Sequence, residues 1–323
     1  MTNSREFLEC ARDGRKTSGA MFIALLEQII PRLEGYRLEQ VTSDANLWAK
    51  SLRGVARLVE SDVITMGWDV SIVAQACGVP MRWENDRPIL GAAPGSLNGE
   101  AANAHRMPAF LETVRILCAS ADELARVVAI PGVCALAEKV LGCEPDRAKA
   151  QALKRAMCEI GESICKARPD MLVVFETLNG HDNAMAGARR ACATLKNVAE
   201  YYRVPLAICL GGYRDASDAA RCALDTSVDH LMIGLDAAGQ VPDAEEILRA
   251  ASTKKSIGLA FFPDDGEKVA REVDRILALG RKLSPHTAIY FITPGPVGCD
   301  SDLTALKETV RAVRQAKPGQ GAI

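Results

Sequence analysis

The stretch ITMGWDVSIVAQACG, residues 64–78, joins two kinds of local structure. Its first residues form an apolar run typical of a buried strand, and its last residues repeat apolar side chains at helical spacing. Trp68 and Asp69 fall between the two patterns, where a strand would open into a turn. In α/β proteins catalytic side chains gather at such junctions, so a chain that repeats the junction is predicted to bring several polar groups together.

Short apolar runs return at fairly regular intervals along the chain. They cover residues 19–26, 62–68, 126–132, 170–176, 204–210, 229–235, 256–262 and 287–293. The segments between them repeat apolar residues at three- and four-residue steps, as amphipathic helices do. Continuous apolar runs suit parallel strands covered on both faces, so eight such units predict an α/β fold of the (β/α)8 TIM-barrel type. A doubly wound open sheet is the alternative, but no glycine-rich phosphate loop follows the first run.

An irregular segment, residues 81–108, follows the second strand–helix unit. MRWE and PIL flank the turn-forming residues NDR and predict a β-hairpin, and the Gly, Pro and Asn residues after it predict a loop over one end of the barrel. That loop is either a lid or a decoration. No Pro/Gly/Ser-rich linker divides the chain, so we expect one domain over residues 1–316 and a flexible tail over residues 317–323.

The composition excludes several functions. The 323 residues carry a formal net charge of -2 with dispersed Lys and Arg, which leaves no basic face for nucleic acid, and no run is apolar enough to span a membrane. The start lacks an apolar signal core, so export is not expected. The 11 cysteines then indicate reduced thiols and a cytoplasmic location, most of them as small buried hydrophobes.

Candidate site residues, most of them polar or titratable, follow the predicted strands at the points where the strands end. They are Trp68, Asp69, Glu176, Asn179, His181, Cys209, Tyr213, Arg214, Asp236, Phe262 and Cys299. In a barrel these positions converge on one mouth, where carboxylates against apolar walls acquire pKa values suited to general acid chemistry. We therefore predict that Asp69, Glu176 and His181 are catalytic. The structural alternatives are a hydrogen bond to Glu176 from a strand-end amide or an arginine, and a solvated loop position for His181.

Four segments carry a resemblance to a known family. The segments SDANLWAKSLRGVARLVESDVITMGWDVSIVAQACGVPMRWEND, FETLNG, IGLD and ITPGPVGCDSDLTALKETVRAVRQA resemble, in this order, parts of the uroporphyrinogen decarboxylase superfamily. The resemblance covers nearly the whole chain and implies a TIM barrel. It matches Asp69 to the aspartate that, in the decarboxylases, points into the cleft and accepts hydrogen bonds from pyrrole N–H groups.

Two departures separate this chain from the true decarboxylases. Their first strand exit bears arginines that bind the substrate carboxylates, whereas this chain reads MFIALLEQIIPRLEG, with Glu27 where cations are needed. Carboxylates without charge-assisted partners in a partly desolvated mouth cost roughly several kcal/mol each. The eighth apolar run also ends in TPGPVG, without the histidine of that enzyme. Uroporphyrinogen is therefore not the expected substrate.

The chain also resembles the other large branch of this superfamily, the methyltransferases that move methyl groups to or from a corrinoid. Members that activate thiols bind zinc through His-x-Cys after the fifth strand and Cys after the eighth, and the zinc lowers the thiol pKa. Here Cys209-Leu-Gly211 stands at the first motif, so that site is incomplete. Cys209 and Cys299 are the candidate zinc ligands; alternatively, Cys209 is only the last buried residue of its strand. The groups that could complete the set are Glu176, His181 and Asp236.

This resemblance implies demethylation, in which a small methylated substrate passes its methyl group to cobalamin or another corrinoid. The leaving oxygen needs a proton, which a carboxylic acid with a raised pKa can give. The predicted substrate-binding residues are Trp68, Asn179, Tyr213, Arg214, Asp236 and Phe262. A corrinoid protein is the expected partner because the chain lacks the DxHxxG cobalamin signature, and a homodimer is the assembly that the relatives suggest.

Two other functions remain open at this point. A decarboxylase or other lyase acting on a small carboxylic or tetrapyrrole-like acid would keep Asp69 for the polar edge of its substrate, in a closed pocket with a cation. A non-catalytic barrel would keep the fold and lose the chemistry. A corrinoid partner instead predicts a broad, open mouth.

Overall fold

The computed structural model describes residues 4–15, 17, 19–94, 100–120, 123–141, 147–178, 182–225 and 227–316. The predicted tail, residues 317–323, lies outside this part of the chain. No helix within the described ranges has both the length and the apolar character needed to cross a membrane.

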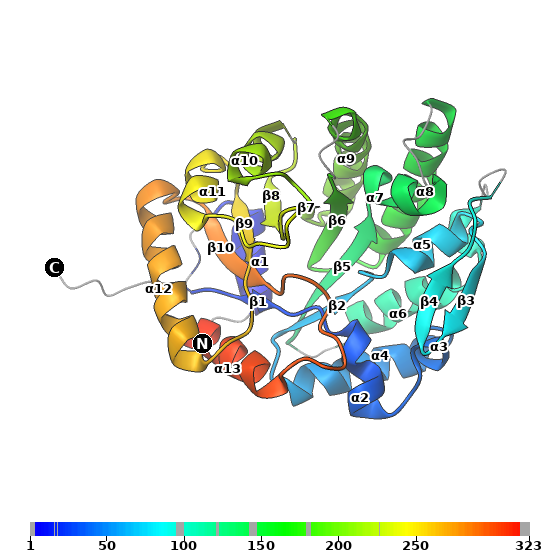
Figure 1. Ribbon diagram of the computed structural model, residues 1–323, viewed down its shortest axis with the longest axis horizontal. Helices are drawn as coiled ribbons and strands as arrows, with labels where there is room; N and C mark the ends of the chain where they lie inside the picture. The colour runs from blue at the N-terminus through cyan, green and yellow to red at the C-terminus, as the bar shows by residue number, and fades with distance from the viewer. Residues whose placement is uncertain are drawn as a thin grey trace.

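Eight parallel strands form a nearly closed barrel with helices around it (Figure 1), so the predicted TIM barrel is confirmed and the open doubly wound sheet is excluded. Each predicted apolar run contains one strand. The strands are β1 (Phe22–Ile23), β2 (Val63–Met66), β5 (Ala125–Pro131), β6 (Met171–Thr177), β7 (Leu206–Gly211), β8 (His230–Ile233), β9 (Ser256–Ala260) and β10 (Ala288–Ile292). Their hydrogen-bonded order is β1-β10-β9-β8-β7-β6-β5-β2.

The helices alternate with the strands and lie outside the barrel, as their apolar spacing predicts. They are α1 (Ser4–Arg12), α2 (Ile30–Glu34), α3 (Leu38–Val41), α4 (Ala45–Leu58), α5 (Val70–Ala76), α6 (Met107–Ala119), α7 (Val133–Leu141), α8 (Arg147–Lys166), α9 (Asp182–Tyr202), α10 (Ala216–Asp225), α11 (Ala244–Ala250), α12 (Gly266–Leu283) and α13 (Leu303–Gln315). Helix α1 is the exception, because its Phe7 packs edge-on against Tyr290 of β10 inside the barrel, with ring centroids 6.3 Å apart. It covers the amino end of the strands, where the Ser4 hydroxyl donates to the carbonyl of Asp62 at 2.7 Å.

The barrel closes between β1 and β2 through a side chain instead of a backbone ladder. Strand β1 is only two residues long, and three residues after it the chain enters the short 3-10 helix η1 (Glu27–Ile29). Thr65 of β2 fills the gap: its hydroxyl donates to the carbonyl of Ala24 at 2.7 Å and accepts from the N–H of Leu26 at 3.4 Å. The buried polar groups at the end of the short strand are thereby paired.

Alternate residues of each strand face the barrel interior and the helix layer. In β6, Met171 and Val173 belong to the interior cluster, whereas Leu172 and Val174 pack with the helices. This alternation explains why the runs are apolar throughout. We call the end of the barrel at which the strands finish the mouth. The same alternation decides which side chains at the strand ends can point toward it.

The predicted hairpin is confirmed as β3 (Met81–Glu84) and β4 (Arg87–Leu90), which pair antiparallel. Its turn consists of Asn85 and Asp86, both with positive φ (49° and 59°), as a two-residue type I′ turn requires. Arg87, which the sequence placed in the turn, belongs to β4. The Asp86 carboxylate anchors the hairpin by accepting the N–H of Leu38 at 2.7 Å. Residues 95–99 of the following loop are not described, so its role as lid or decoration stays a prediction.

Candidate functional site

Asp69 lies where β2 opens into α5, as the sequence predicted. It is the N-cap of α5, and its carboxylate accepts the N–H and the hydroxyl of Ser71 at 2.8 and 2.7 Å. The turn before it depends on Gly67, which has φ of 88° and whose Cβ, if present, would clash with the carbonyl oxygen of Ala129. The Asp69 side chain remains 26% exposed at the mouth.

A buried arginine that the sequence analysis missed is paired with Asp69. The Arg106 side chain is only 7% exposed, and its Nη1 lies 3.7 Å from Asp69 Oδ2. Its Nη2 and Nε donate to Ser71 Oγ and Gln75 Oε1, both at 2.8 Å. The guanidinium also lies over the ring of Trp83 in the hairpin, 5.2 Å from its centroid, which is a cation–π geometry. Burial lowers the pKa of Arg106 from its usual value, while the charge of Asp69 opposes that change.

Glu27 completes this group from the end of β1. Its Oε2 accepts the backbone N–H groups of Gly67 and Trp68 at 2.7 and 3.2 Å, and the Trp48 side chain gives a further hydrogen bond. Burial of the carboxyl raises its pKa to about 8, and the negative charge of Asp69 adds to the rise. In the sequence Glu27 stands out only as an acidic residue in place of a cation, because nothing local indicates that it reaches across to the end of β2.

Trp68 and Phe175 form an aromatic wall at the mouth. Their rings stack with centroids 5.5 Å apart and planes at 17°, and both pack against the interior cluster. The indole Nε1 of Trp68 is buried, and within the described part of the chain it has no hydrogen-bond partner. Trp68, a predicted substrate-binding residue, therefore presents a donor that needs an acceptor.

Glu176 faces the helix layer, because it alternates with the inward-facing Phe175. Its Oε2 accepts the N–H groups of Cys134 and Ala135 at 3.0 and 3.1 Å, at the start of α7. These amides correspond to the structural alternative that the sequence left open. The residue is 2% exposed, its Oε1 has no partner among the described residues, and burial raises its pKa to about 7. Gly132 leaves the space for this carboxyl, since a Cβ there would clash with it.

The two candidate zinc ligands lie within β7, for Cys209, and in the loop after β10, for Cys299. Cys209 faces the barrel interior, where burial raises its thiol pKa to about 12, and the next inward position is Gly211, which offers no ligand. The Sγ of Cys299 donates to the carbonyl of Gln28 at 3.5 Å. Across the residues with described positions, no group of three or more His, Cys, Asp or Glu side chains is placed to hold a metal ion. The described residues thus do not fit a zinc centre, and His181 lies outside them.

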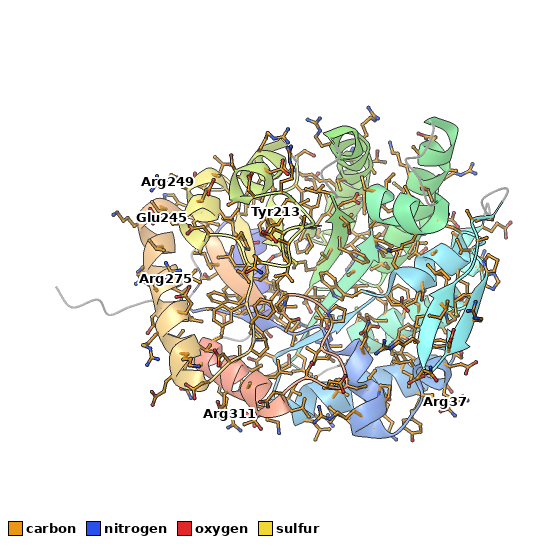
Figure 2. The ribbon with its side chains drawn as sticks, viewed as in Figure 1. Arg37, Tyr213, Glu245, Arg249, Arg275 and Arg311 are labelled. Atoms are coloured by element: carbon orange, nitrogen blue, oxygen red, sulfur yellow. The ribbon has the colours of Figure 1, made fainter. Side chains whose placement is uncertain are left out.

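Four predicted substrate-binding residues lie farther round the barrel, and Asn179 lies outside the described residues. Tyr213, labelled in Figure 2, is fully buried, and its hydroxyl donates to the carbonyl of Gly234 at 2.8 Å. Asp236 holds its own loop by accepting the N–H groups of Ala238 and Gln240. The Arg214 guanidinium is 3.4 Å from Asp218. Phe262 is 53% exposed at the end of β9. Their roles in substrate binding stay predictions.

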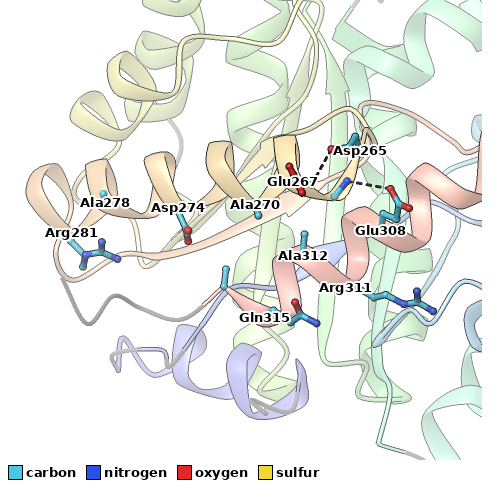
Figure 3. Close-up of a pocket in the computed structure, with 12 residues that line it drawn as sticks. Asp265, Glu267, Ala270, Asp274, Ala278, Arg281, Glu308, Arg311, Ala312 and Gln315 are labelled. Carbon is cyan, nitrogen blue, oxygen red and sulfur yellow. Dashed lines mark hydrogen bonds between the residues drawn. The ribbon is translucent and has the colours of Figure 1, made fainter. Parts of the chain in front are cut away.

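A large surface groove lies away from these residues. A groove of about 960 Å³ lies between α12 and α13 and is lined by Ala270, Asp274, Arg281, Glu308 and Arg311 among others (Figure 3). It contains none of the predicted site residues, so its size does not identify it as the site.

The fold was compared with known proteins. A methyltransferase from Methanosarcina mazei superposes with a TM-score of 0.72 over 97% of this chain and 98% of that chain, at 13% sequence identity. The chain folds like that methyltransferase. This agrees with the barrel that the sequence resemblance implied.

Two further solved structures share the barrel. A B12-independent methionine synthase from Shewanella sp. W3-18-1, in complex with selenomethionine, has a TM-score of 0.56 at 15% identity and covers 93% of this chain and 97% of its own. GH5_18 from Streptomyces cattleya, in complex with GlcNAc, has a TM-score of 0.52 at 10% identity and covers 94% of this chain and 78% of its own. No family model matches the sequence, and no curated protein matches it. Identities this low show the fold alone, so the function must be argued from the site.

Proposed function

We propose that this chain is a methyltransferase that transfers a methyl group between a small methylated substrate and a corrinoid carried by a separate protein. The similarity to a methyltransferase over 97% of the chain supports methyl transfer in general. The corrinoid is the more specific part of the proposal, because a B12-independent methionine synthase shares the fold.

The observation that carries the proposal is the Trp68 indole. A buried donor without a partner costs about 1–3 kcal/mol, so the Nε1–H of Trp68 favours a bound acceptor atom. The heteroatom that bears the methyl group of the substrate would supply that acceptor. The stacked rings of Trp68 and Phe175 would then provide an apolar wall for the rest of the molecule.

Release of a methyl group leaves a negative charge on the heteroatom, which a proton stabilises. Carboxyl groups that hold a proton near neutral pH suit this task, and Glu27 and Glu176 both have raised pKa values. When bound, the reduced corrinoid would supply the nucleophile that takes the methyl group. This chain's own residues would bind the donor, orient it and hold the proton.

The lyase alternative gains no support from Arg106. A small carboxylic substrate needs a cation that is available to meet it. Arg106 is buried and already donates to Ser71 and Gln75, with Asp69 beside it. Arg106 is therefore not available to bind a substrate carboxylate.

The test is to incubate the purified protein with reduced cobalamin and a panel of methylated ethers, amines and thioethers, and to detect the demethylated product by mass spectrometry. We expect product only when cobalamin is present, and a Trp68→Phe variant should raise KM at least several-fold because it removes the indole N–H. A parallel reaction with homocysteine and no cobalamin checks the corrinoid-independent route. Absence of demethylation from every donor in both reactions would contradict the proposal.

A further inference from the structure

We propose that Glu27 is the proton donor of this site and that the carboxylate of Asp69, which Arg106 and Ser71 hold in place, favours the protonated form of Glu27. The donor role rests on the proposed function. The electrostatic role rests on the structure alone, so the two can be tested separately.

Glu27 is better placed than Glu176 to reach a substrate. Glu176 faces α7 and is almost fully buried, whereas residue Glu27 as a whole is only partly buried. The Glu27 carboxyl also binds the backbone N–H of Trp68, the residue whose indole lacks an acceptor among the described residues. A heteroatom held by that indole would therefore lie at the same end of β2 as the Glu27 carboxyl.

Two charged groups in the described part of the chain act on Glu27 in opposite directions: the negative charge of Asp69 raises its pKa, whereas attraction to the Arg106 guanidinium favours the charged carboxylate. Desolvation is the largest cause of the raised pKa of Glu27. The negative charge of Asp69 adds to it by disfavouring a second negative charge on Glu27. Arg106 lies 3.7 Å from Asp69, and Ser71 donates two hydrogen bonds to the same carboxylate. These contacts hold the Asp69 carboxylate in place, while burial and the charge of Asp69 favour the protonated form of Glu27.

The reaction needs no reagent other than the corrinoid for its atoms and electrons to balance. The bond between the substrate heteroatom and the methyl carbon would break with its electron pair staying on the heteroatom, and the corrinoid, when bound, would supply the nucleophile that accepts the methyl group. The proton moves from the Glu27 carboxyl to the heteroatom. The Glu27 carboxylate that remains is stabilised by the N–H groups of Gly67 and Trp68, and it regains a proton from solvent.

Glu27 could instead serve only to join β1 to β2, and the Glu27→Gln variant separates the two roles. A glutamine carbonyl oxygen accepts the same two N–H groups, so the variant should keep the fold, but it cannot give up a proton at neutral pH. We expect turnover to fall by roughly two orders of magnitude or more, while KM stays within about threefold and thermal stability changes little. The activity of the wild-type protein should also fall as the pH rises above that at which Glu27 ionises.

The electrostatic role is tested by carbon-13 NMR titration of glutamate carboxyl groups, with the resonance that vanishes in Glu27→Gln assigned to Glu27. In Asp69→Asn this resonance should titrate at a pH lower by roughly one unit, since the like charge is removed while the cap geometry is kept. Asp243→Asn is the control, because Asp243 also caps a helix, α11, on the other side of the barrel (Figure 1). It should leave the Glu27 resonance and the activity unchanged.

Each outcome decides one part. A Glu27 resonance with the usual glutamate titration, or one that Asp69→Asn does not move, overturns the electrostatic role. A Glu27→Gln variant with wild-type turnover overturns the donor role. A wild-type protein that transfers no methyl group overturns the proposed function and the donor role with it, while the titration still decides the electrostatics.

Discussion

The hydroxyl of Thr65 joins the two ends of the barrel's hydrogen-bonded ladder by donating to the carbonyl of Ala24 at 2.7 Å. The same oxygen accepts the N–H of Leu26, so one side chain replaces the backbone pairing that a two-residue β1 cannot supply. Because Glu27 follows directly, this contact also sets where the Glu27 carboxyl stands relative to Gly67 and Trp68.

Replacing Thr65 by valine should destabilise the protein. Valine has the shape of threonine, but the Ala24 carbonyl and the Leu26 N–H would then lose a buried partner, at a cost of about 1–3 kcal/mol. Urea unfolding followed by circular dichroism measures this cost. Thr65→Ser keeps the hydroxyl and should fall between the two proteins; a valine variant as stable as wild type would show that the barrel closes without this bond.

Stability should decrease as the pH rises from about 4.5 to about 7 because of Glu176. Its pKa rises from 4.5 to about 7 on folding, so the folded protein holds a proton that the unfolded chain releases in this window. The resulting loss is about 3 kcal/mol at pH 8 relative to pH 4. In Glu176→Gln the amide mimics the protonated acid and this loss should disappear, leaving the part due to Glu27, whose pKa rises further, to about 8. Unfolding free energies of both proteins at several pH values give the difference, and parallel curves would contradict the prediction.

Gly67→Ala should be more destabilising than Gly239→Ala. Both glycines have positive φ, 88° and 76°, so alanine at either position costs roughly 1 kcal/mol or more in backbone strain. Only at Gly67 would the new Cβ meet the Ala129 carbonyl oxygen, since nothing lies within 4 Å at Gly239 among the described residues. Thermal unfolding of the two variants separates the clash from the strain. Equal changes in melting temperature would mean that the backbone at residue 67 relaxes freely.

Arg106→Met should cost about 2 kcal/mol or more, because it leaves Asp69, Gln75 and Ser71 without their buried donor. The matched control is Arg249→Met, which removes a 2.7 Å ion pair to Glu245 from a surface where the arginine is 69% exposed. Exposed helix pairs of this kind contribute about 0.5 kcal/mol or less. Chemical denaturation of both variants tests the contrast; similar losses would argue against a stabilising role for the buried cation.

The architecture could be predicted because each strand and helix leaves a local pattern. The eight apolar runs and the hairpin turn at Asn85 and Asp86 are patterns of consecutive residues. Asp69 was identified from the strand–helix junction in which it lies. Patterns of this length specify an element and its end. They do not specify which elements meet.

The missed residues depend on contacts between distant segments. Glu27, after a two-residue strand, contacts the backbone at the end of β2. Arg106, which follows the hairpin insertion in the sequence, pairs with Asp69, which precedes it. Tyr213 shows the opposite case: it follows a strand as a site residue would, but the loop turns its ring into the core and its hydroxyl onto Gly234. Side-chain direction after a strand end is set by tertiary packing, which a single sequence does not display.

The three tryptophans of the chain all border the same group of charges. Trp48 bonds to the Glu27 carboxyl, Trp68 offers it a backbone N–H, and Trp83 lies under the Arg106 guanidinium. The tryptophan fluorescence of the protein therefore comes entirely from around this cluster. Its emission is a built-in optical probe of ionisation and ligand arrival at the mouth, without any attached dye.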